Sequence, residues 1–400
     1  MKKLLVLFLA ATVVLLTGCA DTVDYSADID ALETEIATLK QTIQDLEADV
    51  TDLQNVPEKV VLKVAMITDS GTIDDESFNQ GTWEGIVTYC NANGHLYQYY
   101  KPTEVSDTAY LAAIQLAVND GADVVVTPGF LFESSVYAAQ DLYPDVKFIL
   151  IDGTPHTPDY SMFNTADNTL SILFNEHESG FLAGYAAVKD GYMHLGFTGG
   201  MAVPAVVKFG VGYIAGAYYA AEELGITITF GDDDYHYFGD FGPSDTFKAY
   251  AAARYTAGTE VIFSAAGGAG GSVMAAAEEA GNGAAVIGVD VDQYYLSDTV
   301  ITSALKGLGT AVMTALADIE AGTFVGGQSL MLGAAEGGVG LPMGNSVFAT
   351  FTNADYLAIL EDIADGTVVV PASHADLVTF LAANGAPTGY PAAAVVEPAS

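Results

Sequence analysis

Cysteine and basic residues are both scarce in this 400-residue chain. Of its two cysteines, Cys19 falls at an N-terminal leader and is expected to carry a lipid, and Cys90 stands alone, so no intramolecular disulfide is expected after the leader is cut. Lys and Arg total 12 against 51 Asp and Glu, which gives a formal net charge of -39. Nucleic acids and anionic membrane surfaces are bound through Lys and Arg, so this balance argues against both as partners. It also disfavours an anionic small ligand and favours a neutral one.

Familiar catalytic and metal-binding patterns are missing as well. The sequence has no H-E-x-x-H, C-x-x-C or G-x-S-x-G. The run from Gly267 to Gly271 stands between a predicted strand and a predicted helix, as a phosphate cradle would, but it lacks the G-x-G-x-x-G spacing. The acidic stretch from Asp232 to Asp240 lacks the Gly and Glu of a calcium-binding loop, which favours a solvated turn. We therefore expect no cofactor, no metal site and no enzymatic activity.

The N-terminus has the pattern of a bacterial lipoprotein leader. Met1-Lys2-Lys3 is basic, and the apolar run from Leu4 to Leu16 is short for a membrane span. Leu16-Thr17-Gly18-Cys19 resembles a lipobox. We expect residues 1–18 to be removed and Cys19 to carry a lipid, with an uncut membrane anchor as the alternative.

A heptad pattern follows a short tether at residues 19–26. One heptad position holds β-branched residues and another holds leucines: Ile29, Ile36, Ile43 and Val50, then Leu32, Leu39, Leu46 and Leu53. This combination favours a parallel two-stranded coiled coil. Residues 27–56 are therefore predicted to form a helical stalk, with a possible homodimer through residues 29–53. The alternative is a single helix that acts as a spacer, with its apolar stripe resting on the globular body.

From Val60 onward, predicted strands and helices alternate. The strands of a first series are Val60–Ile67, Leu96–Tyr100, Asp123–Thr127 and Lys147–Ile151, and those of a second are Met193–Phe197, Ile226–Phe230, Val261–Ser264 and Ala284–Val289. Alternation of this kind predicts an α/β fold with parallel sheets. Two successive series predict two lobes with a cleft between them.

The stretch from Lys63 to Gly85 is the most informative. An apolar strand leads into the polar loop Thr68–Glu76 and then into a helix that begins near Ser77, a possible N-cap. Ligands of open α/β sheets bind at the carboxyl ends of strands. Asp69 could accept hydrogen bonds from hydroxyls, Phe78 could stack on a flat ring, and Asn79 could pair with the edge of a heterocycle. Phe78 as a core residue and Asp69 as a turn residue are the alternatives.

This stretch also carries a resemblance to a known family. D-x-G-x-x-x-D-x-S-F-N-Q-x-x-x-x-G, from Asp69 to Gly85, resembles the opening signature of the basic membrane protein family. Further blocks follow in the family's order: Ile151-Asp152-Gly153, Glu178 to Gly184, Gly196 to Met201, Ala265 to Gly270, and Val286 to Gln293. These proteins are substrate-binding lipoproteins of ABC importers, and the best understood members bind purine nucleosides.

The resemblance implies a type I periplasmic binding protein with two Rossmann-like lobes. Residues 57–170 and about 292–345 are expected in the first lobe, about 171–291 and 346–385 in the second, and 386–400 in a flexible tail. Thr299–Ser303 and Val347–Phe351 are expected to cross between lobes. The implied partners are a nucleoside and an importer permease, and the implied location is the extracytoplasmic face of the cell membrane.

The expected ligand-binding residues combine the chemistry of the loop with the resemblance: Asp69, Phe78, Asn79, Phe209, Gly268, Asp290 and Lys306. Asp290 is implied to bind ribose hydroxyls, and Lys306 to reach a ring atom or a sugar hydroxyl. Phe209 is either a second stacking wall or plain core. Capture of another neutral ligand, such as a sugar, is the alternative function. A surface nucleoside hydrolase is a more distant one, because no ligand set or His partner for water activation stands out.

Overall fold

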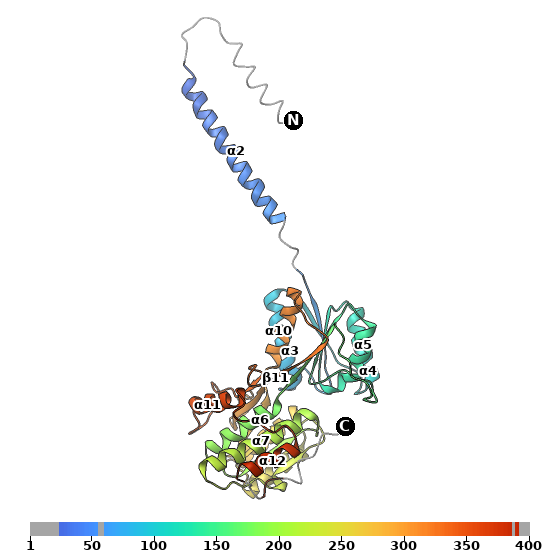
Figure 1. The fold of residues 1–400 in the computed structure, drawn as a ribbon, viewed down its shortest axis with the longest axis vertical. Coiled ribbons are helices and arrows are strands. Elements are labelled where there is room, and N and C mark those ends of the chain that lie inside the picture. Colours follow the sequence, from blue (N-terminus) through green and yellow to red (C-terminus); the bar gives the residue numbers. More distant parts are fainter. Residues whose placement is uncertain (1–23, 55–59, 386–388, 392–400) are drawn as a thin grey trace. The chain divides into compact units, whose positions relative to one another are not determined.

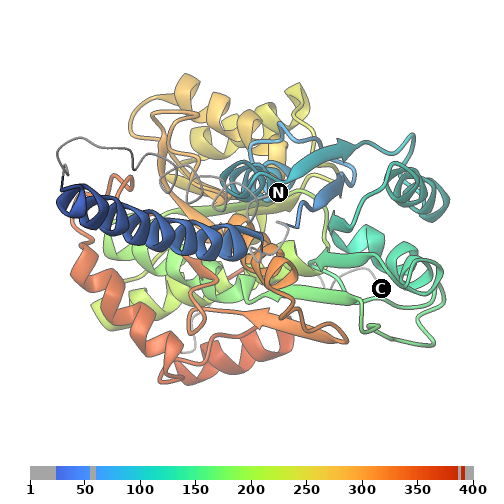
Figure 2. The same ribbon diagram turned by 90° about the horizontal axis from the view of Figure 1, so that it is seen from above.

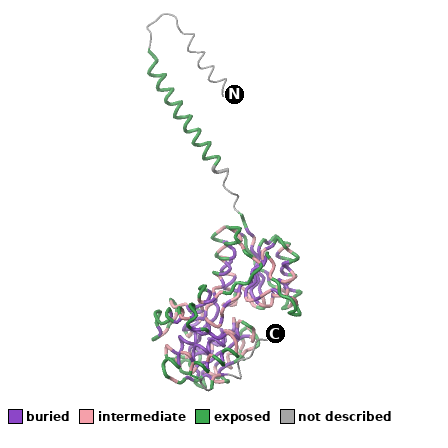
Figure 3. Tube along the Cα trace, in the orientation of Figure 1, coloured by how far each residue is buried: buried purple, intermediate pink, exposed green. Residues whose placement is uncertain are grey.

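The computed structural model describes residues 24–54, 60–385 and 389–391. The expected signal peptide, Cys19 and most of the expected tail lie outside these residues. The chain divides into two compact units, one up to Val60 and one from Val61 onward. The first unit contains helix α2 (Ser26–Gln54), whose bounds are close to those of the predicted stalk at residues 27–56. Every residue from 24 to 51 is exposed (Figure 3).

The second unit contains two six-stranded sheets. The first has the order β11-β5-β4-β3-β1-β2 and the second has the order β12-β10-β9-β8-β6-β7. All pairs are parallel except that between β10 and β12. Two parallel α/β lobes are the fold that the sequence predicted.

The first lobe is a three-layer sandwich (Figure 1). Its strands are β1 (Lys63–Ile67), β2 (Leu96–Tyr100), β3 (Val124–Pro128), β4 (Lys147–Ile151), β5 (Thr169–Phe174) and β11 (Gln328–Leu332). Helices α3 (Phe78–Asn93) and α10 (Leu308–Ala321) cover one face, and α4 (Asp107–Asn119) and α5 (Glu133–Leu142) cover the other. Cys90, on α3, is buried in the core of this lobe.

The second lobe repeats this arrangement. Its strands are β6 (Leu195–Gly199), β7 (Tyr235–Tyr237), β8 (Val261–Ala265), β9 (Ala285–Asp290), β10 (Val300–Lys306) and β12 (Val339–Gly340). Helices α8 (Asp245–Ala257) and α9 (Gly270–Ala280) cover one face; the other packs on α6 (Glu176–Lys189), α7 (Pro204–Leu224), α11 (Asn353–Ala364) and α12 (His374–Ala383). In Figures 1 and 2 the red helices α11 and α12 lie beside the green pair α6 and α7.

Glycines allow the closest helix contact of this lobe. A Cβ on Gly184 of α6 would lie 2.2 Å from the carbonyl oxygen of Tyr213, and one on Gly216 of α7 would lie 2.0 Å from that of Phe181. The two backbones can approach this closely only because neither helix has a side chain there. The same close packing recurs next to the cavity described below, where a Cβ on Gly180 of α6 would lie 2.2 Å from the carbonyl oxygen of Phe209 on α7.

The chain passes between the lobes three times, and here two sequence expectations were wrong. The strand that begins near Thr299 is β10, and it belongs to the second sheet rather than crossing back into the first lobe. The first crossing lies at Asn175, the second at Gly307, and the third between β11 and β12. Val347–Phe351 does not cross either, because the Val347 amide donates to the carbonyl oxygen of Ile301 on β10 and Phe351 is buried in the core of the second lobe. Of the expected first-lobe segment 292–345, only α10 and β11 join that lobe.

Three strands also differ from expectation. Ile226–Phe230 forms only an isolated bridge at Thr229, and the edge of the second sheet is instead β7. β5 and β11 were not predicted at all. β11 has four exposed residues at the edge of its sheet, so its sequence lacks the apolar run that marks a buried strand.

Candidate functional site

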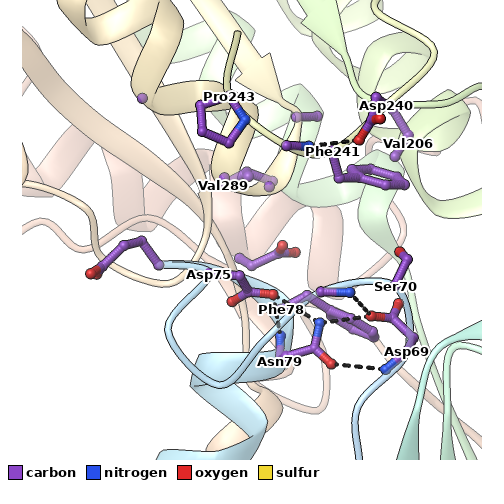
Figure 4. A pocket seen from close by; sticks show the side chains of 18 of the residues that line it. Asp69, Ser70, Asp75, Phe78, Asn79, Val206, Asp240, Phe241, Pro243 and Val289 are labelled. Atoms are coloured by element: carbon purple, nitrogen blue, oxygen red, sulfur yellow. Dashed lines mark hydrogen bonds between the residues drawn. The ribbon is translucent and has the colours of Figure 1, made fainter. Parts of the chain in front are cut away.

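A cavity of about 750 Å³ lies between the carboxyl ends of the two sheets. It is lined by all seven residues expected to bind a ligand: Asp69, Phe78, Asn79, Phe209, Gly268, Asp290 and Lys306. Figure 4 shows Asp69, Phe78 and Asn79 facing Val206 and Phe241 of the second lobe. The structure therefore brings together residues that are up to 237 positions apart, while Cys19 lies outside the described part of the chain.

The polar side of the cavity is built at the start of α3. Asp69 and Asn79 bond to each other twice: Nδ2 of Asn79 donates to Oδ1 of Asp69 at 2.9 Å, and the Asp69 amide donates to Oδ1 of Asn79 at 3.3 Å. The Gly71 amide also donates to Asp69, at 2.7 Å. Burial raises the pKa of Asp69 to about 6, against these hydrogen bonds. The loop thus presents a fixed carboxyl and amide to the cavity.

Asp75, rather than Ser77, caps α3. The carboxylate of Asp75 accepts hydrogen bonds from the amides of Ser77, Asn79 and Gln80, each at 3.0 Å. Ser77 stands at the N-cap position, but its side chain makes no capping bond. A carboxylate next to the first turn is also favoured by the helix dipole. The expected N-cap role of Ser77 was therefore wrong, and its hydroxyl is free for another partner.

That partner is Asp290, at the end of β9. Oγ of Ser77 donates to Oδ2 of Asp290 at 2.5 Å, which joins the two lobes across the cavity. Asp290 has a φ of 66°, a conformation that is uncommon for a residue other than glycine. Burial raises its pKa, although Lys306 and Ser77 oppose the rise. A buried carboxylate in a strained backbone, fixed by one hydroxyl, is suited to accept further hydroxyl donors.

A second link between the lobes lies beside the first. Nε2 of Gln293 donates to the carbonyl oxygen of Glu76 at 2.7 Å, and the Tyr295 hydroxyl donates to the Glu76 carboxylate at 2.7 Å. Glu76 has a φ of 55°. The loop before α3 therefore contacts the second lobe through backbone and side chain, and this contact limits how the lobes can separate.

Lys306 lies in a buried ion network rather than free in the cavity. Its Nζ pairs with Oδ2 of Asp152 from the first lobe and lies 3.4 Å from Oε1 of Glu176 from the second. Glu176 also pairs with Lys208, at 3.2 Å. Burial alone would lower the pKa of Lys306, but the surrounding carboxylates outweigh it and raise that pKa. Lys306 therefore stays protonated.

Aromatic rings form the remaining walls. Phe78 is half-buried, and the Lys306 ammonium lies 4.7 Å from its ring centroid. Phe209 is only 2% exposed and packs edge-on against Phe263 at 5.8 Å, so it combines the core and wall roles left open by the sequence. Phe241, on the loop after β7, is half-buried and lies on the opposite side from Phe78 (Figure 4).

The glycine-rich run borders the cavity with backbone. Gly267, Gly268 and Gly271 line it, and Gly267 has a φ of 55°. Gly268 lies close to the loop that carries Phe241: a Cβ there would meet the Phe241 carbonyl oxygen at 3.4 Å. Asp292, in contrast, does not line the cavity; its carboxylate accepts hydrogen bonds from Tyr294 and Asn345.

The acidic stretch from Asp232 to Asp240 was expected to be a solvated turn, but one of its aspartates is buried and hydrogen-bonded. Asp234 is buried and accepts hydrogen bonds from Thr259 at 2.9 Å and from the Gly231 amide at 3.2 Å, with His194 at 3.1 Å. Within the described ranges, no group of three or more His, Cys, Asp or Glu residues is placed to hold a metal ion. Nor is any described helix both long and apolar enough to cross a membrane.

Comparison with known proteins gives this site its context. Residues 62–374 match the family Bmp, described as "ABC transporter substrate-binding protein PnrA-like". The chain belongs to the Bmp family. It is 31% identical over 335 residues to the "ABC transporter nucleoside-binding protein BmpA" of Lactococcus lactis, covering 78% of this chain and 90% of that one. It is also 30% identical over 322 residues to "Basic membrane protein A" of Borreliella burgdorferi, covering 80% and 90%.

Solved structures agree on the fold. An ABC transporter solute-binding protein from Aeropyrum pernix superposes with a TM-score of 0.67 at 24% identity, over 81% of this chain and 98% of that one. One from Conexibacter woesei gives a TM-score of 0.60 at 21% identity, over 78% and 99%. The resemblance seen in the sequence is thus confirmed, and Bmp proteins are substrate-binding proteins of ABC transporters.

Sequence reasoning missed three residues of this Bmp cavity. Phe241 stands in a polar loop without periodicity, so nothing in the pattern marks it as a wall. Asp75 lies within the signature from Asp69 to Gly85, but sequence reasoning assigned it no role. Asp152 did give a signal, because it directly follows a strand of the parallel sheet, as Asp290 ends one. Its φ of 57° matches that of Asp290 as well.

Proposed function

We propose that this Bmp protein captures a purine nucleoside between its lobes and delivers it to the permease of an ABC importer. The observation that carries the proposal is the meeting, in one cavity, of half-buried aromatic rings with the Asp69–Asn79 pair and the buried carboxylate of Asp290. Aromatic faces stack on a flat heterocycle, an amide and a carboxyl pair with its edge, and a carboxylate accepts hydroxyl donors. The printed name of the Lactococcus relative supports the same ligand class.

The proposed roles follow from these positions. Phe78 and Phe241 enclose the base, and Phe209 closes the wall behind it. Asn79 and Asp69 read the edge of the base, while Asp290 binds the ribose hydroxyls. Gly268 lends backbone groups. Lys306 acts through the network that it forms with Asp152, which fixes one lobe against the other.

The charge of the cavity favours a nucleoside over a nucleotide. Its lining includes eight carboxylate residues, at positions 69, 74, 75, 76, 152, 240, 278 and 290, while Lys306 is the one basic residue among the described residues that line it. Since Lys306 is already paired with carboxylates, a phosphate would enter a field of like charge. The alternative of a plain sugar leaves the two facing aromatic rings without a flat partner.

The location belongs to the same proposal. The leader and Cys19 have the pattern of a lipoprotein, and a lipid on that cysteine would hold the protein at the extracytoplasmic face of the cell membrane. A binding protein held there meets external nucleosides and its permease on one surface. Labelling with a radioactive fatty acid, compared between the native chain and Cys19→Ser, tests the anchor.

Thermal unfolding against a ligand panel tests the function. The chain from residue 20 onward, unfolded and refolded to remove carried-over ligand, is heated with guanosine, inosine, adenosine, their 5′-monophosphates, free bases or ribose. A ligand at a hundred times its dissociation constant adds about 2.7 kcal/mol of stability. We expect the purine nucleosides to raise the midpoint, and ribose and the monophosphates to leave it unchanged. A raised midpoint with ribose alone would favour the alternative function, which is capture of a sugar. Release of free hypoxanthine when the protein is incubated with inosine would instead show that the protein is a nucleoside hydrolase.

A further inference from the structure

The apolar stripe of helix α2 consists of exposed side chains. Seven of its residues are large aliphatics in heptad positions, and each is between 49% and 57% exposed: Ile29, Leu32, Ile36, Leu39, Ile43, Leu46 and Val50. Figure 3 shows the helix exposed along its length. Helices of proteins owe most of their stability to packing of an apolar face, so a bare stripe of this length calls for a partner.

The other faces of α2 need none. Threonine hydroxyls at Thr34, Thr38 and Thr42 donate to the carbonyl oxygens four residues earlier, at 2.9 to 3.0 Å. Gln41 donates to Asp45 at 2.9 Å. The polar surface is therefore satisfied within the helix and by water, and the demand for a partner is confined to the stripe.

The identity of the stripe residues selects the partner. We propose that α2 pairs with α2 of a second copy of this chain, as a parallel and in-register coiled coil. Three isoleucines and a valine occupy one core position, and leucines occupy the other, which is the combination that favours two parallel strands. Since the helix spans 29 residues, it offers four heptads to this seam.

The charges that flank the seam make the pairing depend on salt. In a parallel dimer, Glu35 of one copy faces Lys40 of the other, which is attractive, whereas Asp28 faces Glu33, which is repulsive. The helix carries eight acidic residues and one lysine, so two copies repel each other overall. Screening weakens this repulsion without weakening the apolar seam. The dimer is therefore stronger at high ionic strength, the reverse of an association held by ion pairs.

The same charges exclude the main competing occupant. An anionic membrane surface also covers apolar helix faces, but it needs basic residues on the polar face. α2 has acidic residues there, so it would be repelled. This proposal is independent of the ligand: dimerisation can fail while nucleosides bind, and the reverse holds as well.

Sedimentation equilibrium of residues 20–400 at low and high potassium chloride tests the proposal. We expect a mass twice that of the chain at 0.5 M salt and partial dissociation at 20 mM. Ile36→Asp should abolish the dimer at both salts, whereas Ala37→Asp, one position away on the outer face, should leave it. A monomer at 0.5 M salt, or equal loss in both variants, would overturn the proposal.

A pair of charge-reversing substitutions separates the effect of charges beside the seam from the effect of the net charge of the helix. Glu33→Lys converts the repulsive contact with Asp28 into an attractive one, and Asp30→Lys makes the same change in charge away from the seam. We expect Glu33→Lys to lower the dissociation constant at 20 mM salt about tenfold, on the scale of paired surface charges, and Asp30→Lys to lower it clearly less. Equal effects would mean that only net charge matters.

Cysteine cross-linking tests the orientation. Leu32→Cys should form a disulfide-linked dimer under mild oxidation, because the two copies of position 32 face each other in a parallel pair. Thr34→Cys, on the outer face, should not, and Cys90 is buried and does not interfere. A dimer that cross-links only when Leu32→Cys is mixed with Val50→Cys would be antiparallel. Binding to anionic vesicles without dimerisation would assign the stripe to a membrane.

Discussion

The two lobes share one backbone plan but contribute different chemistry to the cavity. Their central strands correspond in order. Asp152 directly follows β4, Asp290 ends the corresponding strand β9, and both aspartates have a positive φ. The loop after β1 adds carboxyl and amide groups, whereas the loop after β6 holds glycines. There a Cβ on Gly200 would lie 2.3 Å from the ring of Phe241. One lobe thus supplies polar contacts on a rigid loop, and the other supplies an apolar wall that depends on close packing.

This difference teaches that a repeated fold can divide recognition between its copies. Each lobe keeps the backbone positions that approach a ligand, and only the side chains at those positions differ. Substitutions that remove a link between the lobes should therefore act differently from those that alter one wall.

The largest effect is expected at the ion network. Lys306→Met leaves Asp152 buried without its cation and Glu176 paired with Lys208 alone, and breaking a buried pair by removing one partner costs about 3–5 kcal/mol. Urea unfolding measures this loss. Lys208→Met is the matched control, because its side chain is partly exposed, and it should cost much less. Equal losses would show that Lys306 does not hold the lobes together.

Phe209→Ala should cost a similar amount, about 3–5 kcal/mol of stability, since the ring is fully packed in the second lobe. Calorimetric unfolding of the variant without ligand measures this. A stable variant with lost binding would instead make Phe209 a wall alone.

The facing rings should affect binding more than stability. Phe78→Ala and Phe241→Ala each remove a half-buried ring from one side of the cavity, and each should weaken nucleoside binding by about 2–3 kcal/mol. Titration calorimetry with inosine measures the loss. Normal affinity in either variant would remove that ring from the proposed site.

Ser77→Ala tests the contact across the lobes. Without the Ser77 hydroxyl, Asp290 loses the group that fixes its carboxylate, and inosine should bind about 1–2 kcal/mol more weakly. Hypoxanthine, which lacks the ribose, should lose little, and Ser77→Thr should restore inosine binding. Equal losses for the base and the nucleoside would point to general disruption of the loop.

Asp69→Asn should change how stability depends on pH. The pKa of Asp69 is raised to about 6 in the folded state, above the ordinary value of 3.8. The folded protein therefore binds more protons between these values, so this group's contribution is full below about pH 4 and is lost as the pH rises through about 6. The variant should flatten this slope and be more stable by about 1 kcal/mol at pH 7.5, after allowance for solvent screening. Thermal unfolding at pH 4.5 and 7.5 measures the difference.

Local patterns in the sequence predicted the fold and the cavity residues Asp69, Phe78 and Asn79, whereas the family resemblance supplied the roles of more distant cavity residues such as Asp290 and Lys306. An apolar strand, a polar loop and the signature from Asp69 to Gly85 can each be recognised within one short stretch of sequence. The path of the chain between the lobes was not predictable in this way. β10 and β11 are short strands with opposite burial, and the partner of each is set by the sheet that it joins rather than by its own residues. Phe241 and the true role of Ser77 depended on contacts between distant segments.

The triple crossing has a consequence for how the protein folds. The first lobe needs α10 and β11 to complete its core, but the chain reaches them only after residues 176–306, which belong to the second. As the ribosome works from the N-terminus, the first lobe stays unfinished until most of the second has been made. A Cβ on Gly85 would lie 2.5 Å from Gly309, so the late-arriving α10 must dock on α3 with little room for error. Contacts that join such distant segments form slowly. The chain is therefore expected to stay open until its synthesis is nearly complete, and truncations before residue 332 should yield no folded lobe at the N-terminus.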